Sequence, residues 1–198
     1  FSRLTLNAAH NRTKSERDRP YELHRTLCKA WEDPMSARIL MRVEDEKPGI
    51  VTVIVQSLAE PDWSRLGAPR DYLRSVEGPK HIEMKALKPG QHLQFRLRCR
   101  PTKRIGARDN IDRGKRRGIT TKHEIFDWLK RKAEANGFKV CEASFERVYW
   151  YDSKNGLKNC LLGGIQFDGV LEVTNPERLR DAILNGKKKK KAYGFGLL

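Results

Sequence analysis

The sequence predicts an α+β protein that contains two tandem ferredoxin-like domains, each with the βαββαβ order of RRM domains. The 198 residues are enough for two domains of about 100 residues each. The predicted order of strands and helices occurs twice, and the segment "KPG" at residues 88–90 separates the two occurrences. We therefore expect an N-terminal domain at residues 1–89 and a C-terminal domain at residues 90–198.

The first occurrence begins with the alternating run "FSRLTLN", which predicts a strand, followed by a polar loop at residues 8–19. Pro20 suits the first position of a helix that extends to Trp31. The remaining elements are, in order, strands at residues 37–44 and 49–57, a short helix at residues 69–76 and a strand at residues 81–87. The second of these strands is apolar on both faces, which is typical of a central strand.

The second occurrence begins with a strand at residues 92–100 that alternates cleanly between apolar and polar side chains. A basic loop at residues 101–119 follows it. Thr121 and Glu124 have the spacing of a capping box at the start of a helix. The remaining elements are, in order, this helix to Asn136 and Gly137, strands at residues 138–152 and 161–173 joined by the turn "SKNG", a helix from Pro176 to Gly186, and a final strand that begins in "YGFGLL".

Cysteine usage and hydropathy indicate a reducing compartment. Cys28, Cys99, Cys141 and Cys160 are widely spaced and form no CxxC pair, which argues against a zinc site and against a disulfide framework. The sequence has no apolar run of the roughly 18 residues that a membrane-spanning helix needs, and no signal-peptide pattern. We therefore expect a cytoplasmic protein without membrane attachment.

Positive charge is concentrated in the second half of the chain. The chain holds 41 Lys and Arg against 25 Asp and Glu, a net charge of +16. Residues 1–89 carry 16 basic and 13 acidic side chains, whereas residues 90–198 carry 25 and 12. This excess favours a polyanionic partner, with nucleic acid as the first candidate. An anionic membrane is disfavoured because no basic helix has a strong apolar face.

The helix at residues 20–31 carries the candidate catalytic histidine. At about 100° per residue, its core stripe contains four side chains: Leu23, Leu27, Ala30 and Trp31. The opposite side carries Tyr21, Arg25, Cys28 and Lys29. His24 lies at the rim between these two sets, and spacing alone leaves both a structural and a functional role open.

The charge excess makes a functional role for His24 attractive because RNA carries its own nucleophile, the 2′-OH beside each phosphate. Metal-free cleavage needs a base for that proton, an acid for the departing 5′-oxygen and cations around the phosphorane-like transition state. Histidine serves in either proton-transfer role near neutral pH, and Tyr21 can orient a reacting group. No HExxH, paired-carboxylate, GxSxG or Walker motif competes with this set, and we expect neither a metal nor another cofactor.

Three basic elements are candidate RNA contacts. The polar face of strand 92–100 carries Arg96, Arg98 and Arg100, which either line a groove or form salt bridges with helices. The loop after it contains Lys103 and Arg104 within a dense basic stretch at residues 100–122, which is either a solvated loop or an arm that orders on RNA. The hairpin at residues 146–160 carries Lys154 and Lys158, and its aromatic residues suit either a core or an RNA groove.

Four segments together resemble one known family: "PYELHRTLCKAW", "ALKPGQHLQFRLRCRPTKR", "FDGVLEV" and "KAYGFGLL". The chain is similar, essentially from end to end, to CasE, the CRISPR repeat-processing endoribonucleases of the type I-E Cascade complex. The resemblance implies tandem ferredoxin-like domains and metal-independent cleavage at the base of a repeat stem-loop. It also implies a 2′,3′-cyclic phosphate and a 5′-hydroxyl as product ends, retention of the mature crRNA, and other Cascade subunits as partners.

The resemblance also implies roles for individual residues. The catalytic histidine of the family matches His24, and the assisting tyrosine of some members matches Tyr21. The basic positions after the histidine match Arg25 and Lys29, which we expect to contact phosphate.

The family's closing loop, GxGxxKxxGxGLL, is altered in this chain. It appears here as "GKKKKKAYGFGLL", in which Lys191 matches the family lysine but Lys188 replaces the second glycine. Lysine lacks the freedom of glycine at positive φ, so close approach of this backbone to RNA is in question. The alternative function is a non-cleaving RNA-binding subunit of a ribonucleoprotein assembly.

Overall fold

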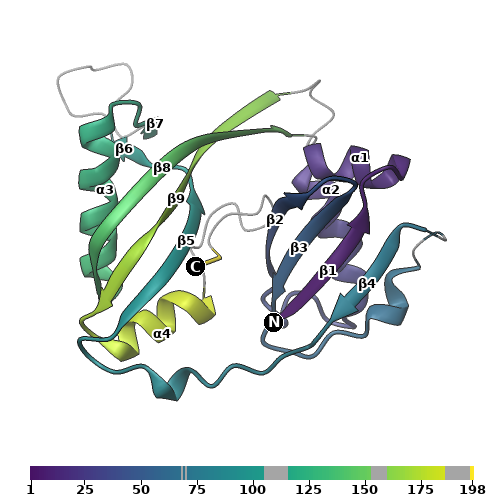
Figure 1. The fold of residues 1–198 in the computed structure, drawn as a ribbon, viewed down its shortest axis with the longest axis horizontal. Coiled ribbons are helices and arrows are strands. Elements are labelled where there is room, and N and C mark those ends of the chain that lie inside the picture. The colour runs from purple at the N-terminus through teal and green to yellow at the C-terminus, as the bar shows by residue number, and fades with distance from the viewer. Residues whose placement is uncertain (68, 70, 105–115, 153–159, 186–196) are drawn as a thin grey trace. The chain divides into compact units, whose positions relative to one another are not determined.

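The computed structural model describes residues 1–67, 69, 71–104, 116–152, 160–185 and 197–198, and the chain divides into two units (Figure 1). The first unit contains Phe1–Ala86 together with Tyr149–Leu162 and Ala182–Leu198. The second contains Leu87–Val148 and Gly163–Asp181. The division into domains at residues 1–89 and 90–198 remains our proposal.

A four-stranded sheet forms the centre of the first unit, in the order β2-β3-β1-β4. Its strands are β1 (Ser2–Asn7), β2 (Leu40–Lys47), β3 (Ile50–Gln56) and β4 (Leu73–Glu77). Every neighbouring pair is antiparallel, and β3 lies inside the sheet between β1 and β2, as its apolar sequence predicts. This strand order is the ferredoxin-like order, which confirms the predicted fold class for this unit.

The helix predicted from Pro20 forms as α2 (Pro20–Leu27), continued by a 3-10 turn at Cys28–Ala30. The four side chains of the predicted core stripe are all buried, and Leu23 and Leu27 are each only 1% exposed. They pack in one cluster with the inward side chains of the sheet: Leu4, Leu6, Val51, Val53 and Val55. Burial of this stripe, rather than intrinsic helix propensity, holds so short a helix in place.

The predicted loop at residues 8–19 is wrong, because it contains the helix α1 (Asn11–Asp18). This helix has no apolar stripe that could reveal it in the sequence. Its N-terminus is capped by His10, whose Nδ1 accepts a hydrogen bond from the Arg12 backbone N–H at 3.1 Å. The inward-facing Glu16 then finds buried polar partners, so tertiary contacts stabilise the helix.

The last two elements predicted for this half are also wrong. The described residues among 69–76 do not form a helix: Asp71 has a φ of 66°, outside the helical region, and β4 begins at Leu73. Residues 81–87 contain only a 3-10 turn at Met84–Ala86, because β4 already pairs with β1 at that side of the sheet. A 3-10 turn at Trp63–Leu66 stands where a full helix would complete the βαββαβ order.

The second unit contains a three-stranded sheet in the order β5-β9-β8 with two helices. The strands and helices are β5 (His92–Cys99), α3 (Lys122–Ala135), β8 (Phe138–Asp152), β9 (Cys160–Val173) and α4 (Pro176–Asn185). The ends of three of them, at residues 149–152, 160–162 and 182–185, belong to the first unit. The predicted alternation of β5 is confirmed, because Phe95, Leu97 and Cys99 are buried whereas the arginines of the other face are not. The turn "SKNG" and residues 193–196 of the predicted final strand lie outside the described residues.

Helix α3 begins and ends where the sequence predicts. Gly137, at a φ of 78°, follows the C-cap residue Asn136, and an added Cβ there would lie 2.3 Å from the Asn175 carbonyl oxygen. The capping box itself is wrong: Thr121 Oγ1 donates to the Glu124 carboxylate at 2.8 Å and makes no side-chain bond to the helix backbone. In the described part of the chain, no helix is long and apolar enough to cross a bilayer.

Between β5 and α3, the predicted basic loop contains a short antiparallel ribbon of β6 (Thr102–Arg104) and β7 (Arg116–Gly118). The loop prediction is therefore wrong at its two ends, while its middle lies outside the described residues.

Candidate functional site

The polar flank of α2 and the turn after it carries four of the predicted site residues: Tyr21, His24, Arg25 and Lys29. Residues three and four apart on a helix share a face, so this spacing places Tyr21, His24 and Arg25 along one flank. Tyr21 and His24 are half-buried, whereas Arg25 and Lys29 are more open to solvent. The structure thus places an imidazole and a phenol beside two cations that solvent or a ligand can reach.

His24 has an unusual environment for a histidine at a helix rim. Its Nδ1 is buried and has no hydrogen-bond partner among the described residues. Burial also lowers the pKa of the imidazole below its ordinary value, because the charged form loses hydration. A buried polar atom without a partner requires an explanation, and an imidazole ring held in its neutral form for proton transfer is one.

The cations beside His24 are weakly engaged. Arg25 donates to Glu22 at 3.3 Å, and its side chain is 66% exposed. An exposed ion pair of this kind contributes little to stability, so the guanidinium is available to an incoming anion. Arg25 can therefore serve as a phosphate contact without disturbing the fold.

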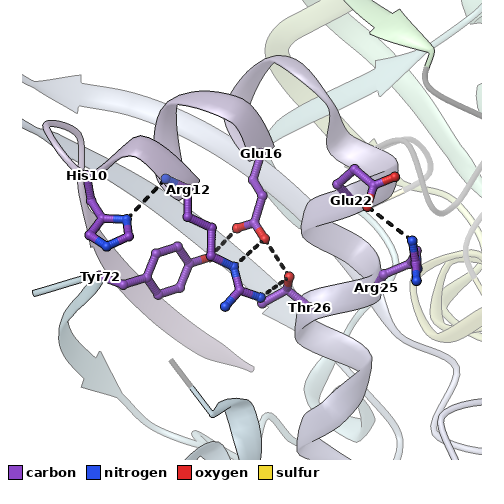
Figure 2. A network of polar contacts seen from close by, with 7 residues as sticks. All are labelled: His10, Arg12, Glu16, Glu22, Arg25, Thr26 and Tyr72. Atoms are coloured by element: carbon purple, nitrogen blue, oxygen red, sulfur yellow. Dashed lines mark hydrogen bonds and ion pairs between the residues drawn. The ribbon is translucent and has the colours of Figure 1, made fainter. Parts of the chain in front are cut away.

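A buried polar network contacts α2 and stabilises it (Figure 2). The Glu16 carboxylate, on a residue only 5% exposed, accepts from Arg12 Nε at 2.8 Å and from Thr26 Oγ1 at 2.5 Å. It also accepts from the Tyr72 hydroxyl. Because Thr26 lies on α2 two residues after His24, the network joins α1, α2 and the start of β4 around the segment that carries the histidine.

The other contacts of the network satisfy the buried charges. Arg12 Nη2 donates to Thr26 Oγ1 at 2.7 Å, and its guanidinium lies over the Tyr72 ring, 5.1 Å from the ring centroid. Burial, followed by the hydrogen bond to Glu16, raises the pKa of Tyr72 far above its ordinary value, so the phenol stays protonated as a donor. Sequence reasoning missed this network, although the Arg12–Glu16 spacing of four residues was a usable signal.

The predicted arginines of β5 lie on the open face of the second sheet. Arg96 Nε donates to Asp168 at 2.5 Å, and Arg98 Nη2 donates to Gln166 at 2.7 Å. Both acceptors are direct register partners on β9. Arg96 thus forms its salt bridge with the neighbouring strand rather than with a helix, whereas Arg98 binds an uncharged amide there. Arg96 keeps 39% of its side-chain surface exposed despite this pair.

The ribbon of β6 and β7 concentrates further cations. Lys103 lies opposite Arg117, and Arg104 lies opposite Arg116. Like charges opposite each other destabilise a strand pair, and among the described contacts the carboxylate of Glu124 binds Lys103. Lys103 and hydrogen bonding from Thr121 lower the pKa of Glu124.

The outcome for the remaining predicted contacts is mixed. Arg100 and Arg104 are exposed, and the paired Arg116 and Arg117 were not singled out from the sequence. Three further predicted contacts lie outside the described residues: Lys154, Lys158 and Lys191. The described residues therefore form a histidine-bearing helix flank in the first unit and a cation-rich sheet face and ribbon in the second.

Comparison with known proteins identifies the family. A family model described as "CRISPR associated protein" matches residues 1–198. The CRISPR-associated endoribonuclease Cse3 of Thermus thermophilus is 36% identical over 218 residues, which cover 100% of this chain and 97% of Cse3.

Solved structures agree with this assignment. Cse3 bound to a 19-nt RNA superposes with a TM-score of 0.83 at 35% identity, covering 99% of this chain and 96% of that one. Thermus thermophilus Cse3 bound to an RNA representing a pre-cleavage complex gives the same TM-score at 34% identity, with 99% and 95% covered. Cas6e of Escherichia coli K-12, at 24% identity and a TM-score of 0.69 over 100% and 97% of the chains, shares the fold. This chain belongs to the CRISPR-associated protein family that includes Cse3, which confirms the CasE resemblance seen in its motifs.

Proposed function

We propose that this protein is a metal-independent endoribonuclease that binds a CRISPR repeat stem-loop and cleaves it at the base of the stem. Cse3, at 36% identity over the full chain, is named an endoribonuclease, and its structures hold RNA, one of them as a pre-cleavage complex. The observation that carries the proposal for this chain is His24, whose buried Nδ1 has no partner among the described residues and whose flank carries accessible cations.

The proposed reaction uses the nucleophile of the RNA itself. The 2′-oxygen attacks the adjacent phosphorus while its proton leaves, and the bond from phosphorus to the 5′-oxygen breaks. The products are a 2′,3′-cyclic phosphate and a 5′-hydroxyl that has gained a proton. His24 transfers one of these protons as a general acid or base, and Tyr21 orients the reacting groups. Arg25 and Lys29 stabilise the charge on the phosphorane-like transition state.

RNA binding is assigned to cations of the second unit and to three lysines of residues 149–162 and 182–198, which the first unit contains. The proposed contacts are Arg96, Arg98, Arg100, Lys103, Arg104, Lys154, Lys158 and Lys191. The ribbon supports this assignment, because cations opposite each other gain most from an anionic backbone placed between them. After cleavage, the protein retains the mature crRNA and works with other Cascade subunits in the prokaryotic cytoplasm, a role that membership of the family supports.

The test is a single-turnover cleavage assay on a labelled stem-loop repeat from the genome that encodes this chain, in excess EDTA. A second RNA carries a 2′-deoxy substitution at the cut site, and binding is measured for both. We expect cleavage of the first RNA, protection of the second, and equal affinity for the two. Tight binding without cleavage of either RNA would replace the proposal with the alternative, a non-cleaving RNA-binding subunit.

A further inference from the structure

Three side chains with metal-binding atoms lie together in the second unit. They are His92 on β5, Cys141 on β8 and Glu172 on β9. Their imidazole nitrogen, thiol sulfur and carboxylate oxygen all lie within 4.8 Å of one another. The group therefore combines three donor types from three strands of one sheet.

The backbone explains how this group forms. His92 and Glu172 are direct register partners in the β5–β9 ladder, so their side chains project from the same face. Cys141 lies with these two side chains at a point where the in–out alternation of β8 shifts by one residue, since Cys141 and Glu142 are both exposed. A local irregularity of this kind in a strand re-aims a side chain.

The residue opposite the shift is a glycine for a steric reason. A Cβ added to Gly169 would lie 2.1 Å from the Glu142 carbonyl oxygen and 2.9 Å from the Ala143 Cα. Any side chain at this position would push β8 away from β9. Gly169 therefore permits a close backbone approach of β9 to β8 at Glu142 and Ala143, directly after Cys141.

We propose that His92, Cys141 and Glu172 form a Zn²⁺ site with three protein ligands and a water molecule in the fourth position. Nitrogen, thiolate and carboxylate donors are those that zinc accepts in tetrahedral sites. Neighbouring donors in such a site are about 3.5 Å apart for bonds of about 2.0–2.3 Å, so side-chain rotation alone closes the group around an ion. On binding, the thiol releases its proton to solvent and the thiolate binds the metal.

The site is accessible, because His92 and Cys141 are exposed and Glu172 is partly exposed. Gln94 and Val170, the next residues on the same face of β5 and β9, line an open groove of about 560 Å³. A bound ion would join β5, β8 and β9 across the sheet and so stabilise the second unit. The proposal is independent of RNA cleavage and assigns zinc no role in it.

The spacing of 92, 141 and 172 resembles no zinc signature, and for this reason the sequence predicted no metal site. Strand pairing, not sequence proximity, brings the ligands together.

The first experiment measures zinc binding to the EDTA-treated and desalted full chain by titration calorimetry. We expect one Zn²⁺ per chain, and a loss of at least about tenfold in affinity for Cys141→Ser and for His92→Ala, since even a residue that only orients a metal ligand contributes about 10–100-fold. The matched controls are Cys28→Ser, which removes a thiol of the first unit, and His123→Ala, which removes an exposed histidine that pairs with Asp127. Zinc affinity that survives in both ligand variants, or is lost in either control, would overturn the site.

A second measurement needs no variant and remains informative if a variant does not fold. The unaltered chain is alkylated with iodoacetamide, with and without Zn²⁺, and each cysteine is followed by mass spectrometry. We expect zinc to slow modification of the exposed Cys141 at least tenfold and to leave Cys28 unchanged. Equal modification of Cys141 with and without zinc would show that its sulfur is not a ligand.

Discussion

The helix flank of the first unit and the cation-bearing strands of the second differ in how their polar groups are held. Beside α2, two titratable groups are shielded: Glu16 is 5% exposed, and the Nδ1 of His24 is buried. On β5 and the ribbon, the charged groups are partly or fully exposed: Arg96 pairs with Asp168 on the neighbouring strand, and the cations of the ribbon lie opposite one another. Burial changes the pKa of a side chain and fixes its orientation, whereas exposure preserves charge and mobility. The first arrangement suits proton transfer, and the second suits electrostatic binding of a backbone.

The difference between these two regions predicts that loss of the His24 imidazole strongly slows RNA cleavage but leaves RNA binding intact. For His24→Ala we expect the single-turnover rate at saturating RNA to fall about 10²- to 10⁴-fold, the usual contribution of a general acid or base. RNA affinity should stay within about twofold, because the cations that hold the backbone are unchanged. The control is His123→Ala. The His123 side chain is 87% exposed on α3, so we expect this variant to cleave RNA at the normal rate. Cleavage that survives His24→Ala would remove His24 from the mechanism.

The next largest effect concerns stability. Glu16→Ala leaves the Arg12 guanidinium and the Tyr72 hydroxyl without their buried acceptor. We expect the free energy of unfolding to fall by about 3 kcal/mol, near the lower end for a broken buried ion pair because Arg12 is partly exposed. Urea unfolding followed by circular dichroism measures the change. The matched control is Glu22→Ala, which removes the partly exposed partner of Arg25 and should lower the free energy of unfolding by less than about 1 kcal/mol. An equal loss of unfolding free energy in both variants would contradict the difference between the buried and exposed carboxylates.

A smaller effect is expected from the ribbon. The double change Arg104→Ala with Arg117→Ala should lower RNA affinity about tenfold and flatten the log–log salt dependence by about one unit for each phosphate interaction that is removed. The cleavage rate at saturating RNA should not change, because the proposal assigns the reacting phosphate to Arg25 and Lys29 and not to these two residues. Binding is measured by filter binding over a range of salt concentrations. Arg65→Ala, in the first unit and paired with Glu32, tests whether removal of any cation has the same effect.

The smallest effect is a pH dependence of stability that comes from His24. Its pKa in the folded state lies below the ordinary value of 6.5, so the unfolded chain binds a proton more readily than the folded chain. The stability contributed by the neutral imidazole is complete above pH 6.5 and is lost as pH falls below that value. We therefore expect unfolding free energy measured at about pH 7 and about pH 5 to fall more in the unaltered chain than in His24→Gln. An equal fall in both would show that burial does not disfavour the charged imidazole.

The sequence predicts the elements whose apolar residues follow one regular period. The helix from Pro20 has its core stripe where the 3.6-residue period places it, and β5 has its apolar face where alternation places it. These predictions succeed because the hydrophobic effect acts on each of these segments in the same direction as its local pattern.

The segments that failed lack such a pattern or depend on a partner strand. Helix α1 is polar throughout and is held by Glu16 contacts that no local rule reveals. Residues 73–77 become β4 because β1 offers them an open edge and Asp71 interrupts the predicted helix. Tertiary pairing outweighs weak local preference in such segments.

The candidate sites divide in the same way. Sequence alone determined the polar flank of α2, since Tyr21, His24 and Arg25 are neighbours through helical spacing. Only the tertiary structure decided that Glu16 supports this flank, that Arg96 meets Asp168, and that His92, Cys141 and Glu172 converge. These contacts join residues on different helices and strands, and their positions depend on strand register and on the close approach at Gly169. A periodic pattern specifies which face of an element is buried, but not which residue of another element that face will meet.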